Sequence, residues 1–189
     1  LYFANINGLT IGGDAAGEGN IIENLTSQGL VLDWGTRDVI IAGNRIVGNA
    51  GSGIVLQRGV QDVRIGGTVV SSRNVISDSA QHGIRIDADI ERVQVIGNYI
   101  GVADDGITPL ANGDTNIKIV DSSDISIGGV NTNQKNIIAN STFGSGISMV
   151  GNATVRVSVM GNSIYSNSLL GIDLGENGVT NNDTLDTDT

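Results

Sequence analysis

The chain has 189 residues, of which 39% are hydrophobic, and this length and composition predict one domain with a substantial core. It contains 28 glycines, one proline and no cysteine, so disulfide bonds and thiol catalysis are excluded. The formal net charge of -10 at pH 7 argues against nucleic-acid binding, because a polyanion would be repelled. No apolar run approaches the ~20 residues that span a bilayer, so we expect no membrane span.

The first elements of the chain set a pattern that the rest repeats. An apolar-x-apolar triplet at Leu9 and Ile11 is followed by Asn20 and then by a Gly-apolar-x-apolar stretch at residues 29–32. Leu1 and Tyr2 fit the end of a missing strand of this last kind. We therefore expect the chain to begin within a coil, uncapped at the N-terminus.

The same three elements return five more times, in a basic unit of 24 residues. Each is short, has period-two patterning and is separated from the next by turns, which is typical of β-strands. Elements that return in the same direction pair most simply in parallel with their own copies, one turn later. The sequence therefore predicts an all-β solenoid of about six three-stranded coils, forming a single domain over residues 1–189.

One asparagine in each coil is expected to form a ladder at a corner of the solenoid, with its amide bonded to backbone and to the next asparagine. The predicted role of these residues is structural; they are Asn20, Asn44, Asn74, Asn98, Asn136 and Asn162.

The uncapped edges of the parallel sheets can pair with further strands, so we expect either a fragment of a longer chain or a subunit that stacks end to end.

Aromatic platforms for sugar rings are scarce, at 3% of the residues. Trp34 follows the first Gly-apolar-x-apolar stretch, and Tyr99 and Tyr165 follow ladder asparagines. Trp34 either stacks on a ligand or, as is more common for a lone aromatic, covers a turn.

The third coil contains the best candidate for catalysis. Arg85 and Lys118 should be neighbours on adjacent coils, with Asp87 two residues along the strand and His82 at the preceding turn. This patch combines an acid, two bases and the sole histidine. The alternative is an ordinary solvated cross-strand ion pair.

An acidic excursion interrupts the fourth repeat, where 18 residues separate two elements that are 9 or 10 residues apart elsewhere. Asp104 and Asp105 lie in it and Asp114 at its end; Asp183, Asp186 and Asp188 form a similar acidic stretch at the C-terminus. Carboxylate oxygens on loops suit calcium, although no EF-hand spacing is present. The alternative is a solvated acidic loop.

The "IGG…NVIS…GIRI" and "IGNYIG…GI" pattern covers nearly the whole chain and resembles the right-handed parallel β-helix repeats of the pectate-lyase-like superfamily. It also resembles the "IGG…NVI" repeats of large secreted bacterial surface proteins, which implies an extracellular or cell-surface location. His82-Gly83 and Arg85-Ile86 are similar to motifs of polygalacturonases, but Asp87 stands where that family has lysine. The arginine-flanked proline motif of pectate lyases is absent.

The sequence thus favours a non-enzymatic structural or adhesive module, such as a stalk, adhesin or filament segment. Its polar loops would meet a glycan, a cation or a neighbouring subunit, and it would require no cofactor, with calcium as the one candidate. The alternative is a carbohydrate-active enzyme, a polysaccharide lyase or hydrolase, that uses His82, Arg85, Asp87 and Lys118.

Overall fold

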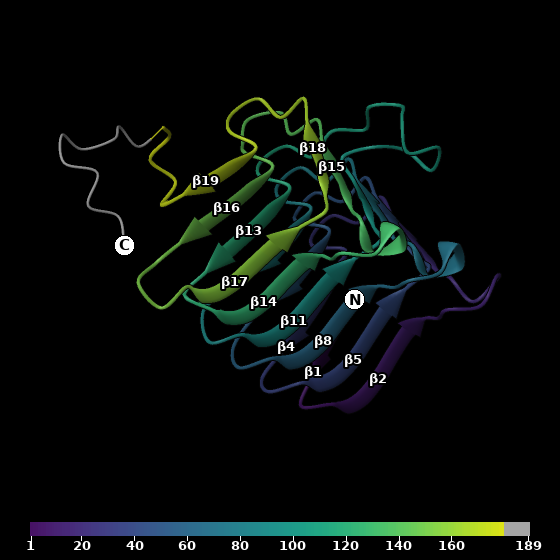
Figure 1. Cartoon of the computed structure of the whole chain (residues 1–189). Helices are drawn as coiled ribbons and strands as arrows, with labels where there is room; N and C mark the ends of the chain where they lie inside the picture. Colours follow the sequence, from purple (N-terminus) through teal and green to yellow (C-terminus); the bar gives the residue numbers. More distant parts are fainter. Residues whose placement is uncertain (180–189) are drawn as a thin grey trace.

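A computed structural model describes residues 1–179 of the chain, and these form a parallel β-helix (Figure 1). The chain passes repeatedly through three parallel sheets, always in the order A, B, C. Sheet A contains β1 (Tyr2–Ala4), β4 (Leu30–Asp33), β7 (Ile54–Leu56), β10 (Ile84–Ile86), β13 (Ile117–Val120), β16 (Ile147–Val150) and β19 (Ile172–Leu174). Sheet B contains β2 (Asn7–Gly12), β5 (Arg37–Ala42), β8 (Gln61–Gly66), β11 (Glu91–Ile96), β14 (Ser123–Gly128) and β17 (Val155–Met160). Sheet C contains β3 (Ile21–Glu23), β6 (Arg45–Val47), β9 (Val75–Ser77), β12 (Tyr99–Ile100), β15 (Ile137–Ala139) and β18 (Ser163–Tyr165).

The predicted all-β solenoid of three-stranded coils is confirmed by this topology. Each strand pairs in parallel with its copy in the next coil, as Ile84 does with Ile54 on one side and with Ile117 on the other. These inward isoleucines are fully buried and stack as one column of the core. Burying such a side chain contributes ~1.5–3 kcal/mol. The repeating columns therefore provide most of the stabilisation of the rod.

The N-terminal strand corrects one detail of the predicted register. Tyr2 pairs with Val31 and Phe3 pairs with Leu32, so Phe3, rather than Tyr2, occupies the last inward position of this strand. Phe3 packs against the core, whereas Tyr2 is exposed. Phe3 precedes Leu9 by six positions, whereas the equivalent Leu32 precedes Val39 by seven, so the connection between the first two strands is one residue shorter than in the next coil.

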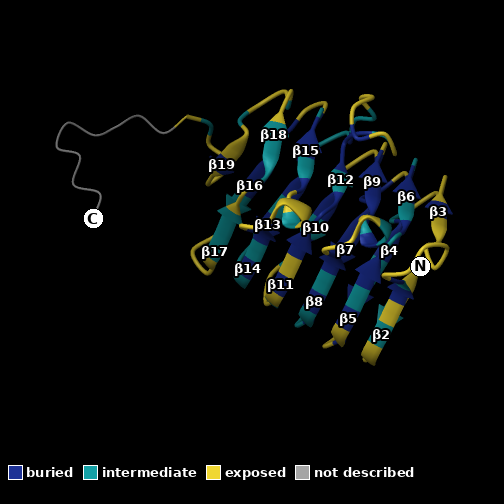
Figure 2. Cartoon of the chain, turned by 45° about the vertical axis from the view of Figure 1, so that its right-hand side comes forward, coloured by how far each residue is buried: buried dark blue, intermediate teal, exposed yellow. Residues whose placement is uncertain are grey.

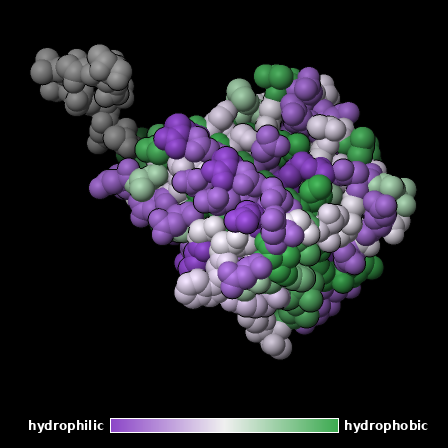
Figure 3. Space-filling view, turned by 90° about the horizontal axis from the view of Figure 1, so that it is seen from below, coloured by the Kyte–Doolittle hydropathy of each residue, from purple (hydrophilic) through white to green (hydrophobic). Residues whose placement is uncertain are grey.

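The two ends of the rod are more exposed than its middle (Figure 2). Within residues 1–179, no helix covers the edge strands, and β3 and β19 each bury one residue of three. Viewed from below, the surface is largely hydrophilic, with a hydrophobic patch at the lower right of the view (Figure 3). None of the helices in the described part of the chain is long and apolar enough to cross a membrane.

The six repeated asparagines lie at the corner between sheets B and C and are hydrogen-bonded to one another. Asn98 shows the pattern: its Oδ1 accepts hydrogen bonds from the backbone nitrogen and from Nδ2 of Asn74, at 3.3 and 2.9 Å. Its Nδ2 donates to the carbonyl oxygens of Ile65 and Ile96, at 2.9 and 3.1 Å. The same side-chain bond links Asn20, Asn44, Asn74, Asn98, Asn136 and Asn162 in succession. The ladder satisfies polar backbone groups that the corner would otherwise bury without partners.

A second polar row, which the sequence reasoning missed, follows sheet C at the opposite corner. The Oδ1 atoms of Asn49 and Asn167 accept hydrogen bonds from the backbone nitrogens of Leu25 and Ser141, both at 3.2 Å. Four residues of this row stand five positions after a ladder asparagine, and Asn112 stands after the acidic excursion. The row consists of Asn49, Ser79, Asn112, Ser141 and Asn167. That spacing is the signal that would have revealed them.

Candidate binding groove on sheet B

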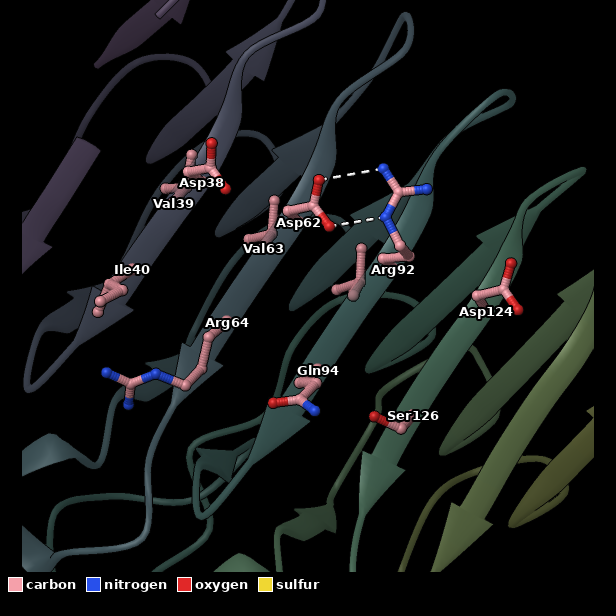
Figure 4. Close-up of a pocket in the computed structure, with 11 residues that line it drawn as sticks. Asp38, Val39, Ile40, Asp62, Val63, Arg64, Arg92, Gln94, Asp124 and Ser126 are labelled. Atoms are coloured by element: carbon pink, nitrogen blue, oxygen red, sulfur yellow. Dashed lines mark hydrogen bonds and ion pairs between the residues drawn. The ribbon is translucent and has the colours of Figure 1, made fainter. Parts of the chain in front are cut away.

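The outer face of sheet B has the same kink in every strand. The second residue of each sheet-B strand has a positive φ; these residues are Gly8, Asp38, Asp62, Arg92, Asp124 and Arg156. Aspartate tolerates this left-handed conformation better than most residues. The repetition of the kink places charged side chains in a row across the coils (Figure 4).

Two bidentate ion pairs neutralise most of this row. Arg92 donates from Nε and Nη2 to Asp62 at 2.6 and 3.0 Å, and Arg156 donates to Asp124 at 2.6 and 2.7 Å. The hydrogen bonds from these arginines hold the pKa values of both carboxyls below their usual range. Asp38 has no ion pair within the described residues and is exposed.

A second row of outward side chains runs parallel to the first and contains Ile40, Arg64, Gln94 and Ser126 (Figure 4). Arg64 is fixed by Asp14 of the loop after β2, with Nη1 and Nη2 at 3.0 and 2.8 Å from its carboxylate oxygens. Between the two rows lies a groove of about 610 Å³ that crosses β5, β8, β11 and β14. Its lining includes three aspartates and two arginines, a formal charge of -1.

The carboxylates of this groove do not have the arrangement that glycoside hydrolysis needs. Glycoside hydrolysis requires two facing carboxyl groups, one of which has a raised pKa. In the groove, the pKa shifts of Asp62 and Asp124 go in the opposite direction, and both carboxylates are held by arginine. Gln94 and Ser126 add neutral donors and acceptors that suit hydroxyl groups.

The sequence reasoning did not select the groove residues. The signal is present, since a charged residue directly precedes the first inward apolar residue in five sheet-B strands, as Asp62 precedes Val63. A left-handed conformation at that position cannot be inferred from the apolar alternation alone, so the apolar pattern does not single these residues out.

The residues of the predicted catalytic patch lie on the outer face of sheet A and at the turn before β10. Arg85 pairs with Lys118 across β10 and β13, as the repeat implies. Arg85 donates to Asp87 at 2.7 Å, while Lys118 pairs with Glu176 at 2.7 Å. His82 is buried, its Nδ1 lies 3.2 Å from the carbonyl oxygen of Thr115, and burial lowers its pKa. Arg85 and Asp87 thus pair with each other, whereas Lys118 and His82 have partners outside the predicted patch.

The acidic excursion forms a loop near sheet C that is held by hydrogen bonds between its own residues. An isolated antiparallel bridge joins Val102 to Pro109, and the Asp105 carboxylate accepts from the backbone nitrogens of Ile107 and Thr108, at 2.9 and 2.8 Å. Asp104 instead lies 3.4 Å from Arg45 of β6.

Asp114 lies at the far end of the excursion and accepts a hydrogen bond from the backbone nitrogen of Thr115, at 2.7 Å. The structure does not bring Asp104, Asp105 and Asp114 together, and residues 1–179 contain no group of three or more acidic, histidine or cysteine side chains placed to hold a metal. The predicted calcium cluster of these three carboxylates is therefore not formed. The acidic stretch at Asp183, Asp186 and Asp188 lies outside the described residues.

Trp34 belongs to a cluster around a buried carboxylate at the end of β4. Asp33 is fully buried and accepts hydrogen bonds from Tyr2, Gln57 and Arg58, at 2.6, 2.9 and 2.5 Å. The Arg58 guanidinium carbon lies 4.7 Å from the centroid of the Trp34 ring, so it occupies one face of that ring. Trp34 covers this cluster and remains 53% exposed.

The Asp33 cluster predicts a pH effect on stability. Burial alone would raise the pKa of Asp33, but the hydrogen bonds from Tyr2, Gln57, Trp34 and Arg58 outweigh it and lower the pKa. A carboxyl with a lowered folded-state pKa stabilises the fold above its unfolded value of about 3.9, and this contribution is lost as the pH falls through the folded-state value. Asp33→Asn should therefore lose less stability than the wild type between pH 7 and pH values below about 4.

Urea unfolding at a series of pH values measures this difference in stability. Asp38→Asn, an exposed control, should keep the wild-type profile; an unchanged profile for Asp33→Asn would contradict the assignment.

Comparison with known proteins leaves the family of this chain open. No protein-family model matches the chain, and no curated protein matches it. Among solved structures, the A-module of mannuronan C-5 epimerase AlgE6 from Azotobacter vinelandii is similar over 93% of this chain and 51% of that chain, with 18% identity and a TM-score of 0.48. This chain thus spans about half the length of that module. The fold assignment rests on the strand pairings described above.

Proposed function

We propose that this chain is a rigid, non-catalytic extracellular module that binds a neutral glycan strand along the outer face of sheet B. The observation that carries the proposal is the groove between the two side-chain rows, which crosses four strands of a continuous sheet. An extended polymer suits such a surface, because the groove runs across four successive coils and each contributes side chains to both of its sides. A preformed rigid site also loses little conformational entropy on binding.

Charge favours a neutral glycan over an acidic one. The chain carries a net charge of -10, and the groove contains the unpaired carboxylate of Asp38. The positive charges of Arg92 and Arg64 are already engaged by Asp62 and Asp14. A polyanion would meet repulsion with little compensating attraction. Location at a cell surface is part of the proposal and is supported by the resemblance to repeats of secreted bacterial surface proteins.

Gln94 provides a direct test, because its side chain is exposed and makes no hydrogen bond within the described residues. Gln94→Ala should weaken binding of a neutral glycan such as soluble xylan by about tenfold, a loss of roughly 1.4 kcal/mol, while leaving the melting temperature unchanged. Calorimetric titration measures the affinity. Gln81→Ala, an exposed glutamine outside the groove, is the matched control and should bind as the wild type does. Equal glycan affinity of Gln94→Ala and Gln81→Ala would contradict glycan binding in the groove.

The second candidate function is a polysaccharide lyase or hydrolase on sheet A. It is favoured by the adjacency of Arg85 and Lys118 across β10 and β13 and by the acid Asp87 beside Arg85. New reducing ends or unsaturated products that vanish in Asp87→Ala would establish it and overturn the non-catalytic proposal.

A further inference from the structure

A separate cavity of about 450 Å³ lies at the C-terminal end of the rod, on the side of sheet A. It is lined by residues of the turns before β16 and β19 and by the segment after β19, including Phe143, Leu169, Asp173, Glu176 and Val179. Sites for small organic ligands have volumes of roughly 300–1,000 Å³. The cavity therefore has the size of a small-molecule site, on a different sheet from the groove.

A buried carboxylate without a partner lines this cavity. Asp173, in the middle of β19, is 3% exposed, and its Oδ1 accepts no hydrogen bond from the residues that the structure describes. Its cross-strand neighbour Ser148 is fully buried, and its hydroxyl also has no partner among those residues. Burying a charge without a partner is strongly unfavourable. A ligand that brings a positive charge or a donor to this position would remove the penalty.

The nearby charged groups are already engaged and do not compensate Asp173. Glu176 is paired with Lys118 at 2.7 Å, and Asp114 accepts a hydrogen bond from the Thr115 backbone at 2.7 Å. His82 lies 3.9 Å from Asp114, and burial lowers its pKa, so the imidazole is neutral at pH 7. The field in the cavity is therefore negative.

Large apolar side chains form much of the remaining lining, beside Thr115 and Ser145. Phe143, Leu169 and Val179 are 78%, 61% and 75% exposed, which is unusual for large apolar side chains that line one concave site. An apolar ligand body would cover them, and a cation could also interact with the face of the Phe143 ring. We propose that this cavity binds a small organic ammonium ion, with the ammonium group on Asp173 and an apolar body against Phe143 and Leu169.

The test compares 2-phenylethylammonium with its neutral analogue 2-phenylethanol by calorimetric titration of the whole chain. The cation should bind at least about tenfold more tightly than the alcohol, which corresponds to one charge-assisted hydrogen bond. Asp173→Asn should abolish this preference, whereas Asp38→Asn, an exposed acid on sheet B, should preserve it. Phe143→Ala should weaken both ligands, and its exposed position means that the fold is not at risk.

Thermal unfolding without ligand gives an independent measurement. Asp173→Asn should melt at or above the wild-type temperature, because it removes an uncompensated buried charge. Equal binding of cation and alcohol, wild-type preference in Asp173→Asn, or no heat with either probe at millimolar concentration would each overturn the proposal.

Discussion

Replacement of Asn98 by alanine should lower the free energy of unfolding by about 2–4 kcal/mol, because it breaks the ladder at its centre. Asn98 is fully buried, and its Oδ1 accepts from the backbone nitrogen of Asn74. Alanine leaves that donor buried without a partner, at a cost of about 1–3 kcal/mol, and removes the bond to the Ile65 carbonyl as well. Urea unfolding followed by circular dichroism measures the change.

The matched control for this variant is Asn20→Ala at the exposed end of the ladder. Asn20 donates to Asn44, but no ladder asparagine donates to its own side chain, so its loss should cost less than about 1 kcal/mol. If Asn98→Ala and Asn20→Ala were equally stable, hydrogen bonding of buried backbone groups would not be how the ladder stabilises the fold.

Replacement of Gly66 by alanine should be at least as damaging, at about 2–6 kcal/mol. Gly66 has a φ of +89°, and a Cβ built there would lie 2.0 Å from the carbonyl oxygen of Ile96 and 2.5 Å from Oδ1 of Asn98. The left-handed conformation costs a non-glycine residue about 1–3 kcal/mol, and the overpacking adds about 1–3 kcal/mol. Because the clash is with backbone, it cannot be relieved by a side-chain rotation.

Gly59→Ala separates these two contributions. Gly59 has a φ of +76°, and nothing lies within 4 Å of the point where an alanine methyl group would stand, so the variant has the conformational cost without the clash. Its destabilisation should be about 1–3 kcal/mol. If Gly66→Ala were no worse than Gly59→Ala, the close approach of adjacent coils at Gly66 would not limit stability.

These two sites explain why the fold could be predicted from the sequence. Gly66 belongs to the "IGG" motif, and its partner across the coils is the ladder position Asn98. Backbone geometry requires both residue types at fixed places. The asparagine recurs in every coil and the glycine in every second coil, as Gly12, Gly66 and Gly128, so both are visible in the sequence. The inward isoleucines recur for the same reason, since each must fill a layer of the same width.

The candidate sites were harder to predict, because they depend on backbone conformation and on side-chain contacts that the apolar pattern does not reveal. The groove requires the left-handed kink at Asp62 and Arg92, and the cavity requires the segment that contains Glu176 to pass near Asp173. The sequence identified the neighbours Arg85 and Lys118 correctly from register, but register does not reveal that Lys118 pairs with Glu176. Ion-pair partners that lie outside the repeat, such as Glu176, decide which surface side chains are free to bind a ligand.

A neutral glycan should bind in the groove of sheet B without being cleaved. The isotopically labelled chain can be titrated with xylohexaose while amide chemical shifts are followed and the products in the same samples are analysed. We expect shifts at Ile40, Arg64, Gln94 and Ser126 and an intact oligosaccharide. Shifts centred on Arg85 and Lys118, together with shortened products, would contradict this expectation and place the function on sheet A.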